Sequence, residues 1–215
     1  MIIIGLGHRA RHGKDTAAEA IVRHCNRILK PVLHMGWAGA LYAEVREFLD
    51  SPFTSGNFWK SPRIVDGVML PSWVQPDDNP AQDARMGRHG KHAKLLQWWG
   101  TEYRRAQDSL YWIKKGVATI KAFQAKNPAG VVLVSDTRFI NEFDAIKSLG
   151  GYSIKVRRLN DDGTEFRDPS RDSNHISETE AETYNFDYHI DSKSAVLTEE
   201  LAITTFEYIR ALRGL

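Results

Sequence analysis

The sequence predicts an α/β protein in which helices cover both faces of a parallel β-sheet. Short β-branched runs alternate with amphipathic helical segments along the chain, which is the pattern of strands joined by helices. One run, Val131 to Ser135, is almost continuously apolar, as in strands buried on both faces. The chain has 215 residues, 42% of them hydrophobic and 26% charged, which suffices for one well-buried core. We therefore expect one domain over residues 1–215.

The first half of the chain opens with a strand, a loop and a helix. The strand is expected at Ile2 to Leu6 and the helix at Asp15 to about Leu29. A second strand follows at Val32 to Met35, and a helix at Ala38 to Phe48. From Asp50 to about Gly90, Pro, Gly, Asn and Asp interrupt every periodic pattern, which indicates either irregular structure that faces substrate or an insertion.

The second half returns to regular alternation. Helical periodicity runs in two pieces from Lys91 to Phe123, with a break near Asp108. The remaining expected elements are a strand at Val131 to Ser135, a helix at Asn141 to Leu149, a strand at Tyr152 to Val156, a loop at Asn160 to Asn174, a helical turn at Ser177 to Glu182, a strand at Asp187 to Ile190 and a helix at Thr198 to Leu212.

Charge and cysteine content exclude several classes of protein. Lys and Arg number 29 against 27 Asp and Glu, so any basic function must come from local clusters. Cys25 is the one cysteine, which excludes an internal disulfide and suits a reducing cytoplasm. No stretch approaches the roughly 18 to 20 apolar residues of a membrane span. We expect a cytoplasmic protein with no membrane partner.

The strongest chemical signal lies between the first strand and the first helix. Backbone amides at a helix N-terminus, beside a lysine, form a site suited to nucleotide phosphates. The stretch approaches G-x-x-x-x-G-K-[S/T], with His8 at the first glycine position and Asp15 in place of the hydroxyl that usually ligates Mg²⁺. The residues expected to bind ATP are Arg11, His12, Gly13, Lys14, Asp15 and Thr16. Asp15 or Thr16 would serve the metal; the alternative is a plain turn at Gly13 followed by a solvated Lys14.

Asp136 and Arg138 follow the buried strand that ends at Ser135. Ligands of open parallel sheets bind beyond the carboxyl ends of the strands, so both side chains are expected beside the phosphate loop. Asp136 would hold Mg²⁺ through water, and Arg138 would point into the same crevice. Alternatively, Asp136 caps a turn and Arg138 pairs with Glu142.

Aromatic and polar residues concentrate between Leu95 and Arg105. Trp98, Trp99 and Tyr103 would stack on a base. Gln97 and Glu102 would read its edge, and Arg104 would pair with a phosphate. An equally open alternative is that the aromatic residues pack in the core.

Two further basic segments are candidates for anion binding. Phosphoryl transfer needs cations that neutralise the moving group and a cover that excludes water, and the polar loop after Val156 supplies Arg157, Arg158, Arg167 and Arg171. The alternative is a solvated loop whose arginines are offset by neighbouring aspartates. A basic run from Arg85 to Lys94 would face an anionic substrate, a nucleic acid or solvent.

Five short motifs occur in a fixed order between Ile2 and about Asp191. They are Gly-Lys-Asp-Thr at Gly13 to Thr16, Leu-Gln-x-x-Gly-Thr-Glu at Leu96 to Glu102, Asp-Thr-Arg with a following Asn-Glu at Asp136 to Glu142, Gly-Gly at Gly150, and His-Ile-Ser-Glu at His175 to Glu178. Together they resemble the bacteriophage deoxynucleoside monophosphate kinases, a branch of the P-loop nucleoside monophosphate kinase fold. The resemblance implies a three-layer sandwich around a five-stranded parallel sheet of order 2-3-1-4-5. It also implies a monophosphate-binding region at 50–95 and a lid at 157–175, and makes Asp15 a family trait.

The resemblance implies transfer of the ATP γ-phosphate to a deoxynucleoside monophosphate, with Mg²⁺ as the metal, in the host cytoplasm if a phage encodes the protein. The expected catalytic residues are Lys14, Asp136, Arg138, Arg158 and Arg171, and the expected metal ligands are Asp15, Thr16 and Asp136. The residues expected to bind the acceptor are Arg9, Trp37, Gln97, Trp98, Glu102, Arg104, Arg138, His175 and Glu178. A nucleic-acid partner is disfavoured and a homodimer is left open.

Three other functions stay open. They are a P-loop kinase for another small molecule, a kinase for hydroxymethylated bases in DNA that uses the basic run from Arg85 to Lys94, and a nucleotide-binding module without transfer chemistry. A DNA kinase would bind less tightly as salt is added.

Overall fold

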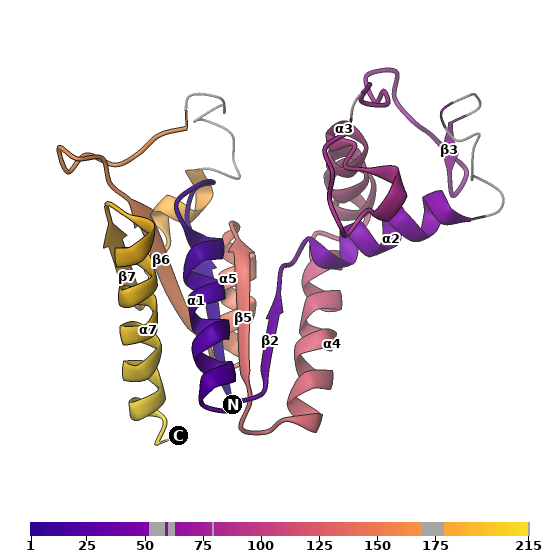
Figure 1. Ribbon diagram of the computed structural model, residues 1–215. Helices are drawn as coiled ribbons and strands as arrows, with labels where there is room; N and C mark the ends of the chain where they lie inside the picture. The colour runs from indigo at the N-terminus through magenta and orange to yellow at the C-terminus, as the bar shows by residue number, and fades with distance from the viewer. Residues whose placement is uncertain (52–58, 60–62, 79, 169–178, 215) are drawn as a thin grey trace. The chain divides into compact units, whose positions relative to one another are not determined.

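The computed structural model describes residues 1–51, 59, 63–78, 80–168 and 179–214 (Figure 1). The chain divides into two compact units. The first, the sheet unit, comprises Met1–Trp37 and Gly116–Leu215, and the second, the helical unit, comprises Ala38–Lys115. The chain leaves the sheet unit after β2 (Val32–Met35) and returns to it within α4 (Tyr111–Lys126).

The sheet unit is built on a five-stranded sheet in which every neighbouring pair of strands is parallel. Its strands are β1 (Ile2–Gly7), β2 (Val32–Met35), β5 (Val131–Thr137), β6 (Tyr152–Arg158) and β7 (Tyr188–Ser192), and their order is β2-β5-β1-β6-β7. These labels differ from the expected 2-3-1-4-5 because a separate hairpin takes the labels β3 and β4. Numbered among themselves along the chain, the five strands of the sheet lie in the order 2-3-1-4-5.

Helices cover both faces of this sheet (Figure 1). On one face, Ile4 and Leu6 of β1 pack in a buried cluster with α1 (Lys14–Arg27) and α7 (Ala195–Leu212). On the other face, Gly5 and Gly7 of β1 lie against α5 (Ile140–Ser148), and a side chain at Gly7 would overlap the ring of Phe143. Large side chains and glycines alternate along β1 because successive residues of a strand face opposite sides of the sheet. The sheet unit is therefore a three-layer α/β structure.

Two strands extend further than their apolar runs predict. β5 continues past Ser135 to Thr137, which pairs with Gly7, so Asp136 is a strand residue and does not follow the strand. β6 continues past Val156 to Arg158, which pairs with Ser192. Arg157 and Arg158 therefore belong to the sheet and not to the lid expected at 157–175. At these ends each strand pairs with one neighbour, β5 with β1 and β6 with β7, so backbone pairing extends the strand beyond its last apolar residue.

The helical unit contains mostly short elements. They are α2 (Gly39–Asp50), an antiparallel hairpin of β3 (Ile64–Val65) and β4 (Val68–Met69), a 3₁₀ turn η1 (Gly87–His89), α3 (Ala93–Gln97) and a π-helical segment η2 (Trp98–Arg105). Its buried core includes Val45 of α2, Met86 just before η1, Leu95 of α3 and Trp99 of η2. The described parts of the 50–90 insertion thus include a short hairpin and one helical turn. A last 3₁₀ turn, η3 (Glu180–Thr183), belongs to the sheet unit.

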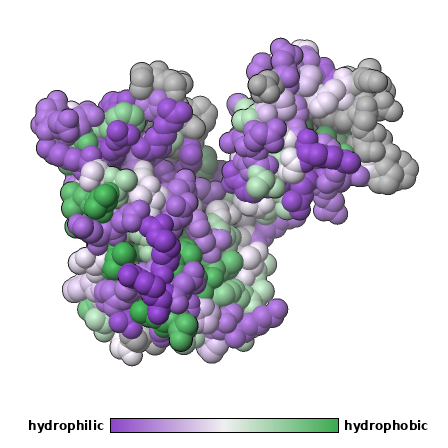
Figure 2. Space-filling view, viewed as in Figure 1, coloured by the Kyte–Doolittle hydropathy of each residue, from purple (hydrophilic) through white to green (hydrophobic). Residues whose placement is uncertain are grey.

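The face of the molecule seen in Figure 2 is mostly hydrophilic, with smaller hydrophobic areas between the polar residues. Large hydrophobic side chains exposed on α7 include Val196, Tyr208 and Leu212. Among the described residues, no helix combines the length and the apolar character that crossing a bilayer requires.

Candidate functional site: a basic pocket at the start of α1

The loop of residues 8–13, which joins β1 to α1, has an unusual backbone. His8, Arg11 and Gly13 have φ angles of 113°, 59° and 89°, in the region that favours glycine. Gly13 is the N-cap of α1, and no side chain of the described chain caps this helix end. Without a side-chain cap, the positive end of the helix dipole and its first amides are suited to an anion.

Lys14 is folded against this loop. The side chain is buried, and its Nζ donates to the carbonyl oxygens of His8 at 3.0 Å and Arg9 at 2.6 Å. The ammonium group therefore fixes the start of the loop and places a positive charge beside the first turn of α1.

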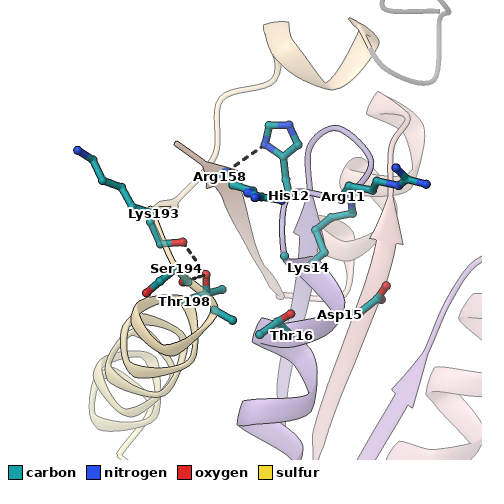
Figure 3. A pocket seen from close by; sticks show the side chains of 12 residues that line it. Arg11, His12, Lys14, Asp15, Thr16, Arg158, Lys193, Ser194 and Thr198 are labelled. Carbon is teal, nitrogen blue, oxygen red and sulfur yellow. Dashed lines mark hydrogen bonds between the residues drawn. The ribbon is translucent and has the colours of Figure 1, made fainter. Parts of the chain in front are cut away.

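A pocket of about 430 Å³ opens beside Lys14 (Figure 3), a size usual for small-molecule sites. It is lined by Arg11, His12, Gly13, Lys14, Asp15, Thr16, Arg158, Ser192, Lys193, Ser194, Ala195 and Thr198. These residues come from the β1–α1 loop, the first turn of α1, the end of β6, and the segment from β7 to the start of α7. Its cationic residues, Arg11, Lys14, Arg158 and Lys193, outnumber its one carboxylate, Asp15, so the lining is basic.

His12 ties the loop to the end of β6. The backbone N–H of Arg158 donates to Nδ1 of His12 at 3.1 Å (Figure 3). Burial lowers the pKa of His12 to about 4, against the opposing effect of the Glu165 carboxylate. His12 is therefore neutral at pH 7 and accepts this hydrogen bond without carrying charge.

Residues 159–168, which we call the β6 extension, supply acidic partners to the same loop. Glu165 Oε1 lies 2.8 Å from His8 Nε2 and 3.6 Å from Arg9 Nε. Asp168 lies 3.2 Å from Arg11 Nε. Beyond the extension, Glu182 of η3 accepts from Arg9 Nε at 2.7 Å. Carboxylates thus pair with both Arg9 and Arg11, and the exposed side chain of Arg11 also lines the pocket.

Of the three expected metal ligands, two line the pocket and one does not. Asp15 is exposed and Thr16 is half-buried, and both line the pocket. Asp136 does not line it; its Oδ1 accepts the backbone N–H of Trp37 at 2.7 Å, and a side chain at Gly36 would overlap its carboxylate. The carboxylate of Asp15 and the hydroxyl of Thr16 are hard oxygen donors of the kind that Mg²⁺ prefers.

The other candidates of the sheet unit that the structure describes do not line the pocket. Arg9 is buried, and Trp37 is buried with its ring close to Gly116. The backbone N–H of Arg138 donates to Glu142 Oε2 at 2.9 Å, so Glu142 caps the start of α5. Arg167 belongs to the β6 extension, whereas Arg171, His175 and Glu178 lie outside the described residues.

The candidates of the helical unit do not line the pocket and make contacts within their own unit. Trp98 is buried and stacks on Tyr103 with ring centres 5.1 Å apart, so the packing alternative describes it better than base stacking. Gln97 and Glu102 are exposed. Arg104 donates through Nε to Glu44, which also accepts from Trp99, Tyr111 and Lys115. Burial would raise the pKa of Glu44, but the four donors hold it below its ordinary value.

Carboxylates also pair with the basic run at 85–94. Arg85 is bound by Asp83, and both Arg88 and His89 contact Asp50. These partners reduce the positive charge that the run would offer to a nucleic-acid backbone.

Seven of the predicted residues therefore share one pocket: Arg11, His12, Gly13, Lys14, Asp15, Thr16 and Arg158. The wall formed by Ser192, Lys193, Ser194 and Thr198 was not predicted. Ser194 is the N-cap of α7, accepting from the N–H of Leu197 at 3.2 Å, and a serine before an apolar periodic segment is the signal that would have found it. Glu165 carries no such local signal.

Fold and pocket together define an α/β protein with a basic strand–loop–helix pocket suited to a phosphorylated ligand. No protein-family model matches the chain. Over 73 residues the chain is 38% identical to a protein of Acanthamoeba polyphaga mimivirus named "Putative deoxynucleotide monophosphate kinase". This similarity covers 30% of the chain and 38% of the length of the viral protein.

Proposed function

We propose that this protein is a nucleotide kinase that transfers the γ-phosphoryl group of ATP to a deoxynucleoside monophosphate. The observation that carries the proposal is the basic pocket at the uncapped start of α1, with Lys14 at its base. The name of the mimivirus relative supports a kinase acting on a small nucleotide. That relative is viral and not from a bacteriophage, so a phage origin forms no part of the proposal.

The donor phosphates would bind at the β1–α1 loop. Lys14 and the first amides of α1 would hold the β- and γ-phosphates, as helix N-termini do with other anions. Arg11 and Arg158, which line the same pocket, would neutralise further phosphate charge. Arg171, outside the described residues, remains a candidate for the same role.

Asp15 and Thr16 would hold the Mg²⁺ that accompanies ATP, with Asp136 contributing through water. The metal would neutralise charge on the phosphates. Asp15 and Thr16 fit this role because their oxygens lie on the first turn of α1 at the pocket.

The acceptor phosphate would be held by Arg138. One of its oxygens attacks the γ-phosphorus, a new P–O bond forms, and the bond to the β-phosphate oxygen breaks with its electron pair going to ADP. The attacking oxygen is already anionic, so no general base is needed, and catalysis consists of positioning and charge stabilisation.

The test is release of ADP from Mg²⁺·ATP with each of the four deoxynucleoside monophosphates, their ribose counterparts and no acceptor. We expect turnover that depends on one or more deoxynucleoside monophosphates. Equal ADP release without an acceptor, or none with any of them, would contradict the proposal. Phosphorylation of hydroxymethylated DNA would support the DNA-kinase alternative.

A further inference from the structure

We infer that Glu165 is a positioning residue for Lys14, acting through His8 and Arg9, and that it holds the β1–α1 loop in its phosphate-binding form. The effect on catalysis rests on the proposed function. The effect of Glu165 on the position of Lys14 can be measured without an assay of phosphoryl transfer.

His8 is the residue whose backbone most needs support. It has φ of 113°, a conformation that L residues rarely adopt, and its side chain is buried. Such a conformation persists only where the surrounding contacts hold it. The hydrogen bond between His8 Nε2 and Glu165 Oε1, at 2.8 Å, is one such contact.

The bond joins a neutral imidazole to a carboxylate. Burial, together with the nearby positive charges of Lys155, Lys14 and Arg9, lowers the pKa of His8 to about 2. His8 therefore donates its Nε2–H to Glu165 throughout the physiological pH range.

Glu165 acts on both residues that hold the lysine. Its carboxylate also lies 3.6 Å from Arg9 Nε, and Arg9 adjoins His8 in the loop. The carbonyl oxygens of His8 and Arg9 are the two that accept hydrogen bonds from Lys14 Nζ. Movement of either backbone would therefore move the ammonium group.

Glu165 is itself anchored to the sheet. The backbone N–H of Phe166 donates to the carbonyl of Arg158 at 2.9 Å, and Glu165 forms an isolated β-bridge with Leu159. The guanidinium of Arg158 lies 4.4 Å from the centre of the Phe166 ring. The carboxylate thus extends from a turn fixed to the end of β6, which gives the loop a rigid support from 157 residues away.

The first experiment measures the position of Lys14 by competitive acetylation of its amine, quantified by mass spectrometry on the full chain. We expect Glu165→Ala to raise the acetylation rate of Lys14 at least about fivefold relative to Lys121, an exposed lysine of α4, because local opening exposes the amine. Glu165→Gln keeps the acceptor for His8 and should raise the rate less than about twofold. The matched control, Asp161→Asn, changes another carboxylate of the β6 extension and should leave the rate unchanged. An unchanged Lys14 rate in Glu165→Ala would overturn the inference, whatever the enzyme assay shows.

The second experiment measures kcat and KM for phosphoryl transfer in the same variants. Loss of positioning should lower kcat at least about tenfold in Glu165→Ala, with a smaller change in KM and near-normal values in Glu165→Gln. If Glu165 instead competes with phosphate, Glu165→Ala will bind inorganic tripolyphosphate more tightly at unchanged kcat, which contradicts the inference. Absence of turnover in the wild-type chain would refute the proposed function alone.

The His8→Gly variant distinguishes an effect of Glu165 on the backbone of residue 8 from an effect of Glu165 on general stability. Glycine adopts positive φ without strain, so Glu165→Ala should change Lys14 acetylation less than about twofold in a His8→Gly background. If Glu165→Ala alone does not fold, the comparison of His8→Gly with the double variant His8→Gly/Glu165→Ala still tests the inference. An equally large effect of Glu165→Ala in both backgrounds would show that His8 does not transmit it.

Discussion

His12 links the β1–α1 loop to the sheet through one ring nitrogen. Its Nδ1 accepts the N–H of Arg158, and burial lowers its pKa to about 4 from an ordinary value of 6.5. Between these two pH values the unfolded chain binds more protons than the folded chain does, so the free energy of unfolding falls as the pH falls. The contribution is fully present above pH 6.5.

The prediction is a loss of up to about 2 kcal/mol of stability from His12 between pH 6.5 and pH 5, at about 1.4 kcal/mol for each pKa unit. In His12→Asn the amide oxygen can still accept from Arg158, and the side chain no longer titrates. Urea unfolding at several pH values should therefore give a shallower pH dependence for this variant. A slope for His12→Asn that equals that of the wild type would contradict the buried, neutral state of His12.

Residues that are adjacent in the sequence can be grouped from a local pattern. Gly13, Lys14, Asp15 and Thr16 are consecutive, follow a strand and open a helix, and the structure brings all four to one pocket. Glu165 could not be found this way, because its partner His8 lies 157 residues earlier and a glutamate in a polar loop has no distinctive pattern. The roles of the pocket residues in ATP and metal binding remain predictions.

At the scale of elements, β2 and β5 meet where a small residue is required. A side chain at Gly36, just after β2, would overlap the carboxylate of Asp136 in β5. The same carboxylate accepts the N–H of Trp37. The two strand ends are thus fixed by one close approach and one hydrogen bond.

Gly36→Ala should therefore displace Asp136 and destabilise the protein by about 1 to 3 kcal/mol, the range for overpacking. Gly39→Ala is the control, because nothing lies within 4 Å of the added methyl group at the start of α2. This second change should be neutral or stabilising by up to about 1 kcal/mol. Thermal unfolding of both variants tests the prediction; equal melting temperatures would show that Asp136 is not held as described.

Apolar patterning located the strands of the sheet but not their ends. Both β5 and β6 end in polar residues. Asp136 of β5 and Arg158 of β6 lie beyond the apolar runs of their strands. Backbone pairing with one neighbour, β1 for β5 and β7 for β6, sets these ends, and a hydropathy pattern does not report it.

At the scale of the whole molecule, the chain forms two compact units, and the second was the harder to predict. The helical unit uses short segments, among them a hairpin with two residues in each strand and a 3₁₀ turn. Such segments are too short to show periodicity, and their burial depends on distant aromatic residues such as Trp99. The sheet unit has longer, periodic elements, and sequence predicted their type and order.

Ligand binding should stabilise the molecule as a whole. If Mg²⁺·ATP binds the folded protein alone, a hundredfold excess over Kd adds about 2.7 kcal/mol, which raises Tm by roughly 5 to 10 °C. Differential scanning fluorimetry should show this shift in the wild-type chain, with Lys14→Met showing little. Equal shifts in both proteins would place the nucleotide away from Lys14.

The proposed kinase activity requires that Lys14 stabilise charge on the transferred phosphoryl group. The most direct test is kcat for ADP release from Mg²⁺·ATP, measured with the best acceptor for the wild type, Lys14→Met and Lys121→Met. We expect kcat to fall at least about a hundredfold in Lys14→Met, as when one charge-stabilising donor is lost, and to stay unchanged in the exposed-lysine control. Wild-type kcat in a folded Lys14→Met variant would contradict the claim.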